Sequence, residues 1–147
     1  MNAEVGTRNA EQQGKSVAVR DLKERTKAFA LSILRLVDDL ARSRASDVIG
    51  HQLLRAATSV AANYRSARRA RSRKEFLAKM GIVEEEADEA QFWVELIVER
   101  GMLDESRVGP LLSEAAQVVA IAVASIRTAR RTPRANPQSA IRNPQCS

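Results

Sequence analysis

The stretch that decides the fold is residues 55–100, which read RAATSVAANYRSARRARSRKEFLAKMGIVEEEADEAQFWVELIVER. In its second half, apolar side chains recur at alternating steps of four and three residues. At about 100° per residue, these positions form one stripe along a helix. The stripe comprises Phe76, Met80, Val83, Ala87, Ala90, Val94 and Ile97. The pattern predicts a long helix that forms one wall of a helical-bundle core.

The two ends of this helix carry their own signals. Ser72 and Glu75 have the spacing of a capping box, in which each side chain satisfies the other residue's backbone N–H. Gly101 supplies a stop, because glycine readily adopts the left-handed conformation that ends many helices. The helix is therefore expected to run from Ser72 to about Gly101.

Two helices are expected upstream. The first should begin between Ser16 and Asp21 and end at residues 42–44. Its stripe is Leu22, Thr26, Phe29, Ile33, Leu36 and Leu40. The second should follow Ser46 as its N-cap and extend to about Arg69. Its stripe is Ile49, Leu53, Ala56, Val60 and Ala67.

A fourth helix is expected to open after Gly109, with Pro110 in its first turn, where proline is tolerated. Its apolar residues are Leu112, Ala115, Val119, Ala122, Ile126 and Ala129, and Leu111, Val118, Ile121 and Val123 extend them nearly around the helix. Such breadth is typical of a helix packed on two sides, by its own bundle and by another subunit.

The chain of 147 residues is long enough for one domain with a real core. The expected class is all-α, with a four-helix bundle over residues 16–131. Residues 1–15 are polar and lack periodicity, so they are expected to be a disordered leader. Residues 132–147 contain three prolines and are expected to be a basic mobile tail.

Composition excludes several function classes. Cys146 is the only cysteine, so neither a disulfide framework nor a cysteine-based zinc site is expected within one chain. No apolar run reaches the roughly 18 residues that a membrane span needs. The N-terminus also lacks the apolar segment of a secretory signal. A cytoplasmic location is therefore expected. Aromatic residues make up 3% of the chain, too few for a base-stacking platform.

Catalytic and metal sites find little support. His51 is the only histidine, and a hydrogen-bonded packing role fits it better than a catalytic base. The acidic run consists of Glu84, Glu85, Glu86, Asp88 and Glu89. None of these acids has a histidine three residues later, as a di-iron bundle requires. No enzyme activity, cofactor, metal or small-molecule substrate is expected.

The densest positive charge lies at the junction of the second and third helices. It comprises Arg65, Arg68, Arg69, Arg71, Arg73 and Lys74. Because arginine contacts phosphates bidentately, this cluster is a candidate nucleic-acid site. The alternative is a solvated turn, or pairing with the acidic run of a neighbouring molecule.

A second candidate surface lies away from the long helix's apolar stripe. It comprises Ile82, Phe92, Trp93 and Leu96. Large apolar groups that share one surface indicate a protein–protein contact, here an oligomer interface. The alternative is that another segment of the same chain covers them.

Asn63 is the polar residue expected on or near the buried side of the second helix. A buried asparagine must find hydrogen-bond partners. It either fixes the register of helix packing, as polar core residues sometimes do, or makes a plain hydrogen bond near its own helix end.

The chain contains RAATSVAAN at residues 55–63, followed by KEF at residues 74–76 and an acidic helix. This pattern resembles that of a family of four-helix bundle proteins encoded in intervening sequences of bacterial 23S rRNA genes. The resemblance covers residues 22–127. It implies an up-down-up-down antiparallel bundle that assembles as a homopentameric ring around a central channel. Related bundles are accessory proteins of diversity-generating retroelements, in which a basic pentamer engages RNA and a reverse transcriptase.

The chain departs from the common family pattern directly after Asn63. Many members have an acidic residue and a glycine there, whereas this chain has Tyr64, Arg65, Ser66 and Ala67. The junction is therefore more basic. Together, these features favour a non-catalytic oligomeric adaptor that binds RNA or a nucleoprotein. The alternative is a protein-interaction scaffold or regulator with no nucleic-acid role.

Overall fold

The computed structural model describes residues 22–131. Within that range the chain forms four α-helices and no strand: α2 (Leu22–Asp38), α3 (Arg44–Ala67), α4 (Arg73–Glu99) and α5 (Glu105–Arg131). The prediction of an all-α four-helix bundle is confirmed. The predicted helix start between Ser16 and Asp21, the leader at residues 1–15 and the tail at residues 132–147 lie outside the described residues.

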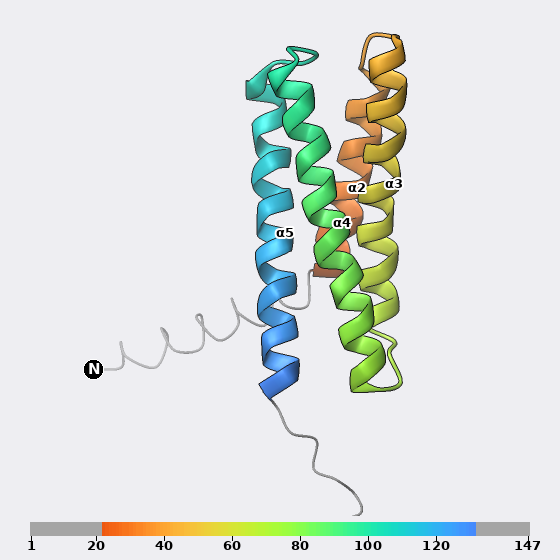
Figure 1. Ribbon diagram of the computed structural model, residues 1–147, viewed down its shortest axis with the longest axis vertical. Helices are drawn as coiled ribbons and strands as arrows, with labels where there is room; N and C mark the ends of the chain where they lie inside the picture. Colours follow the sequence, from red (N-terminus) through yellow and green to blue (C-terminus); the bar gives the residue numbers. More distant parts are fainter. Residues whose placement is uncertain (1–21, 132–147) are drawn as a thin grey trace, which may run out of the picture.

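The helices alternate in direction and pack in chain order, as Figure 1 shows. Short connections join antiparallel neighbours, the arrangement expected for an up-down bundle. The contact between α2 and α5 is the weakest of the four that close the bundle. It includes an ion pair between Arg25 on α2 and Glu114 on α5, whose nearest atoms lie 3.0 Å apart.

Most positions of the predicted stripes form the core, but Ile49, Phe76, Leu112, Val119 and Ala129 are only partly buried, and on α5 Val118 is buried in place of Val119. All six residues predicted for the first helix are buried, and from Met80 to Ile97 every stripe position of α4 is at most 1% exposed. The upper core cluster, at the end of the bundle that holds the α2–α3 and α4–α5 connections, draws on all four helices. Among the described residues, the lower core cluster draws on α3, α4 and α5.

The ends of α4 follow the predicted signals with one change. The Ser72 hydroxyl accepts a hydrogen bond from the Glu75 amide at 3.0 Å, so Ser72 is the N-cap. The Glu75 carboxylate, however, accepts from the Arg71 amide at 2.9 Å, which takes the place of the second half of a capping box. The carboxylate thus ties the preceding turn to the helix.

Gly101 ends α4 as predicted, with a φ of 71°. The Gly101 amide donates to the Val98 carbonyl and the Met102 amide donates to the Ile97 carbonyl, each at 2.9 Å. This pair of bonds is a Schellman motif, which satisfies carbonyls that the helix itself leaves free.

The predicted start of α3 is wrong. Ser43, and not Ser46, is the N-cap: its hydroxyl accepts from the Ser46 amide at 3.1 Å, and the Ser46 hydroxyl accepts from the Ser43 amide at 2.8 Å. Ser46 is therefore the third helical residue and completes a capping box. Arg44 belongs to α3, while α2 already ends at Asp38.

The predicted start of α5 is also wrong. The helix begins at Glu105, which places Pro110 inside it and not in its first turn. The reason is Val108, which is fully buried in the upper core cluster and holds the turn before Gly109 in helical register. Pro110 lacks the N–H that would bond to the Ser106 carbonyl. Because Ser106 and Pro110 are both exposed, water can satisfy that carbonyl.

By length and composition alone, α5 is apolar enough to cross a membrane, and 22% of its most apolar segment is buried within the bundle. Core helices of soluble proteins can have the same length and a similarly apolar composition. Here Val118 and Ala122 pack in the lower core cluster, while Ile121 and Val123 are only partly buried.

Candidate nucleic-acid interface

The α3–α4 connection lies at the lower end of the bundle in Figure 1. Of the six basic residues predicted to bind nucleic acid, five are exposed: Arg65, Arg68, Arg69, Arg71 and Lys74. Arg73 is partly buried, and its Nε is buried without a hydrogen-bond partner among the described residues. The fold therefore presents most of the predicted cluster to solvent.

Part of this basic cluster lines two shallow hollows. The first, of about 520 Å³, is lined by Arg65, Arg69, Arg71 and Glu75 together with Ala62 and Ser66. The second, of about 250 Å³, is lined by Arg65, Arg68, Arg69 and Lys23. The structure thus brings four of the six predicted residues together around adjoining hollows, whereas Arg73 and Lys74 lie beside them on the first turn of α4.

Lys23 and the end of α5 were missed at the sequence level. α5 descends to the same end of the bundle as the α3–α4 connection, which brings Arg127, Arg130 and Arg131 to that end (Figure 1). The predicted up-down topology was enough to place the end of α5 here, because the second and fourth helices of such a bundle end at the same end of the bundle.

The lower end is strongly positive. Residues 65–75 and 127–131 contain nine arginines and lysines and one carboxylate, that of Glu75. Nine positive charges minus one negative charge give these residues a net charge of +8. The whole chain has a net charge of +6, so the rest of the chain is net negative. The positive N-terminal end of the α4 dipole lies here with the negative C-terminal ends of α3 and α5, so the positive charge of this end comes from its side chains. The arrangement suits an anion with several spaced negative charges, such as a phosphate backbone.

Tyr64 is the aromatic residue nearest in sequence to this cluster. Its side chain is partly buried and packs against the lower core cluster. Burial raises the pKa of the phenol, while the positive charge of Arg68 opposes that change. Tyr64 is therefore neutral at physiological pH, and it does not offer a free ring for base stacking.

Part of the acidic run pairs within its own chain. Arg55 on α3 donates hydrogen bonds to Glu86 at 3.1 and 3.2 Å and also bonds to Glu89. The Trp93 indole N–H donates to Glu89 at 3.1 Å. The bond from Arg55, and secondarily that from Trp93, lowers the pKa of the Glu89 carboxyl below its usual value. The same two carboxylates raise the pKa of Arg55.

The four residues predicted as an oligomer interface differ in exposure. Phe92 is 49% exposed, whereas Ile82, Trp93 and Leu96 are partly buried. Trp93 packs against the upper core cluster, and its ring meets that of Phe92 edge-on with centroids 5.0 Å apart. The same chain therefore covers part of Trp93 and leaves Phe92 open to solvent.

Asn63 is partly buried and bonds within its own helix. Its Nδ2 donates to the carbonyl and to the hydroxyl of Ser59, each at 2.9 Å. The hydrogen bond within its own helix, one of the two roles considered for Asn63, is therefore present.

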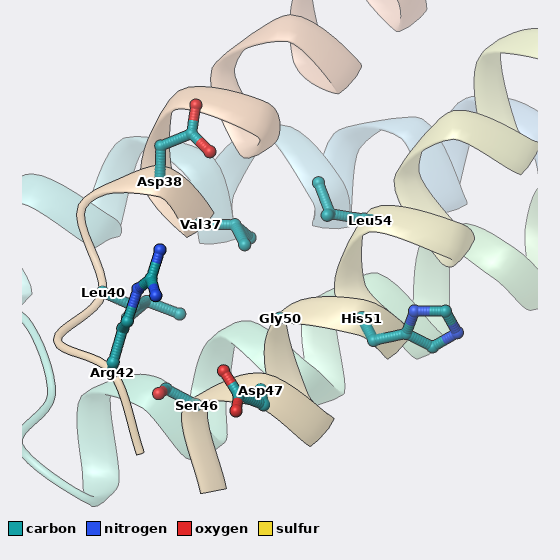
Figure 2. Close-up of a pocket in the computed structure, with 9 residues that line it drawn as sticks. All are labelled: Val37, Asp38, Leu40, Arg42, Ser46, Asp47, Gly50, His51 and Leu54. Carbon is teal, nitrogen blue, oxygen red and sulfur yellow. The ribbon is translucent and has the colours of Figure 1, made fainter. Parts of the chain in front are cut away.

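His51 lies at a hollow of about 360 Å³ between α2 and α3, near the upper end of the bundle. Figure 2 shows that its imidazole is directed away from Asp38 and Asp47, the two carboxylates of that hollow. Within residues 22–131, no group of three or more histidine, cysteine or acidic side chains is placed to hold a metal ion. The hollow therefore offers no base–carboxylate pair for chemistry.

Comparison with known proteins identifies the family. Residues 20–124 match the family described as 23S rRNA-intervening sequence protein. A similar solved structure is that of a protein of unknown function from the S23 ribosomal protein family of Bacteroides thetaiotaomicron VPI-5482. It has 28% identity and a TM-score of 0.67, and the alignment covers 71% of this chain and 97% of that one. None of the curated proteins matches the chain. Because the family match spans well over half of the sequence, the chain belongs to the 23S rRNA-intervening sequence protein family.

Proposed function

We propose that this protein is a non-catalytic oligomeric adaptor that binds RNA, alone or within a nucleoprotein, through the positive lower end of its bundle. The observation that carries the proposal is the convergence of the α3–α4 connection and the end of α5 on that end. Phosphate contacts supply most of the affinity of sequence-independent nucleic-acid binding. Repetition of the same end around an oligomer multiplies weak contacts into useful avidity.

The first alternative role for these arginines is structural. Cations near a helix C-terminus stabilise the helix through its dipole, and Arg65 and Arg68 occupy such positions on α3. That role does not account for Arg71, which lies four residues beyond Ala67, the last residue of α3. The exposure of Arg71 around a hollow that Arg65 and Arg69 also line supports a ligand from outside the chain.

The test of RNA binding replaces charged arginines with glutamine, which is neutral and also has a long polar side chain. A variant with Arg65→Gln, Arg68→Gln, Arg69→Gln and Arg71→Gln should lose at least tenfold in affinity for structured RNA in a low-salt mobility-shift titration. The matched control removes four exposed arginines from the opposite end: Arg35→Gln, Arg42→Gln, Arg44→Gln and Arg100→Gln. It carries the same net charge, so a location-specific site predicts near wild-type binding.

Two results would contradict the proposal. One is the lack of any complex between the wild-type protein and structured RNA at micromolar concentration. The other is an equal loss in both variants, which would indicate that total charge alone attracts RNA. Circular dichroism of both variants checks that the helices remain intact.

The exposed ring of Phe92 favours a second candidate, a scaffold or regulator whose target is another protein. A pull-down from the source lysate with and without nuclease separates the two candidates. Partners lost on nuclease treatment support RNA binding. Partners retained on nuclease treatment, and lost in a Phe92→Glu variant, support the scaffold.

A further inference from the structure

An apolar groove of about 430 Å³ runs between α2 and α3. Its uncharged lining residues are Ala30, Thr58, Ala61 and Ala62 together with Leu31 and Leu34, which are 43% and 39% exposed. The rim carries the cations Lys23, Lys27 and Arg65 and the single carboxylate of Glu24. The groove is therefore apolar along its length and predominantly positive at its edge.

The outer surface of α4 has the opposite charge. Glu85, Asp88, Phe92 and Glu95 are all exposed, and their spacing of three, four and three residues places them in one line along the helix. We name this line the acidic stripe. Phe92 is its single apolar member and is 49% exposed. Glu85 and Asp88 form no ion pair within residues 22–131.

The two surfaces hold most of the exposed large apolar side chains. Among the described residues, four such side chains are exposed: Leu31, Leu34, Val48 and Phe92. Three of them lie in the groove or on the acidic stripe. Large apolar groups rimmed by charge commonly mark protein–protein contact sites.

We propose that the α2–α3 groove receives the acidic stripe of a second copy of this chain, with Phe92 seated against Leu31 and Leu34. In this arrangement, the carboxylates beside Phe92 face Lys23 and Lys27 on α2, whereas Arg65 on α3 lies where the groove adjoins the hollows of the lower end and remains assigned to RNA. Four residues of helix span about 6 Å, so Asp88 stands as far from Phe92 as Lys27 stands from Leu31. The apolar and charged groups therefore match in register as well as in sign.

Charge also argues against the simplest alternative, in which two acidic stripes pack against each other. That contact would place Glu85, Asp88 and Glu95 opposite the same carboxylates, and juxtaposed like charges are costly at an interface. A contact between two different surfaces is head-to-tail, and it closes into a ring when the rotation between copies permits. The inference rests on the oligomeric part of the proposed function and assigns the two surfaces that make the contact.

The test is a charge exchange in the full-length protein. The groove variant carries Lys23→Glu and Lys27→Glu, the stripe variant carries Glu85→Lys and Asp88→Lys, and the combined variant carries all four. Sedimentation velocity over a concentration series at low salt measures assembly. Each double variant should assemble at least tenfold more weakly than wild type, and the combined variant should return to within about threefold, because opposite charges again face each other.

A matched control and a second variant guard against misfolding and against weak charge effects. Leu31→Glu with Leu34→Glu should dissociate the assembly, whereas Val48→Glu changes an exposed apolar residue outside both surfaces and should leave it intact. Circular dichroism confirms that each variant is folded.

The outcomes separate the inference from the proposed function. If the wild-type protein assembles but the groove variants have no effect, or if the combined variant is weaker than either double variant, the groove assignment is wrong and the oligomeric adaptor stands. If the wild-type protein is a monomer at all concentrations, the groove assignment and the oligomeric part of the proposed function both fail. RNA binding by the monomer would still be measured independently.

Discussion

Val37 on α2 and Gly50 on α3 approach so closely that a β-carbon added to Gly50 would lie 2.9 Å from Val37 Cγ1. Both residues line the hollow drawn in Figure 2. The absence of a side chain at residue 50 thus lets the two helices pack tightly at the upper end. Gly50→Ala forces Val37 to move, and overpacking of this kind costs about 1–3 kcal/mol.

Gly81 provides the matched control for that substitution. It lies inside α4, and an added β-carbon would meet nothing within 4 Å. Gly81→Ala should therefore stabilise the protein by about 0.5–1 kcal/mol, since alanine favours a helix over glycine. Urea unfolding of both variants checks the prediction. Equal stabilities for the two would contradict the close approach of α2 and α3.

Glu89 should make stability depend on pH. Because its pKa is lowered in the folded protein, its carboxylate contributes stability above the usual value of 4.5, and this contribution is lost as pH falls through the lowered pKa. Glu89→Gln should therefore lower the melting temperature slightly at pH 7, and the difference from wild type should shrink toward pH 3. The effect is small because the Arg55–Glu89 pair is solvent-exposed.

The partner of Glu89 gives the control. In an Arg55→Gln background, Glu89→Gln should change the melting temperature at pH 7 less than it does in wild type, because the two residues interact directly. A difference between wild type and Glu89→Gln that is the same at pH 3 and pH 7 would show that the carboxylate's charge has no role.

The predicted interface on α4 has its own test. Phe92→Glu together with Leu96→Glu should reduce the oligomer to monomers in light scattering and leave helical content near that of wild type. Phe92 is half exposed in a single copy, so its replacement does not open a hole in the core. A wild-type protein that is already monomeric would contradict this interface.

The fold was largely predictable because each helix carries a regular apolar stripe. The α4 positions from Met80 to Ile97 are buried as their spacing predicts, and the ends of α4 follow from Ser72 and Gly101. Periodicity succeeds here since a stripe of that length fits one helical face and no other structure.

The remaining helix ends depend on competition that local sequence does not resolve. Ser43 and Ser46 both have the chemistry of an N-cap, but Ser46 is buried and its hydroxyl bonds to the Ala41 carbonyl and the Ser43 amide, which leaves Ser43 as the cap. Pro110 marks a favourable first-turn position, yet burial of Val108 extends α5 upstream of it. In both cases tertiary packing overrides a local preference.

The candidate site was predictable in part. The run from Arg65 to Lys74 is contiguous, so sequence alone identifies it. Lys23 and the arginines at the end of α5 join it only through the fold. The positions of Trp93 and Phe92, adjacent in sequence, also differ in three dimensions, since Trp93 folds back onto the upper core cluster and Phe92 does not.

The most direct test of the central claim is the salt dependence of RNA binding by the wild-type protein. Each phosphate that the lower end neutralises should contribute about −0.9 to the slope of log association constant against log salt for a duplex, and about −0.7 for a single strand. Four neutralised phosphates predict a slope of roughly −3 to −4. The variant that lacks the charges of Arg65, Arg68, Arg69 and Arg71 should give a much shallower slope. A wild-type slope near zero, or an unchanged slope in that variant, would contradict the account.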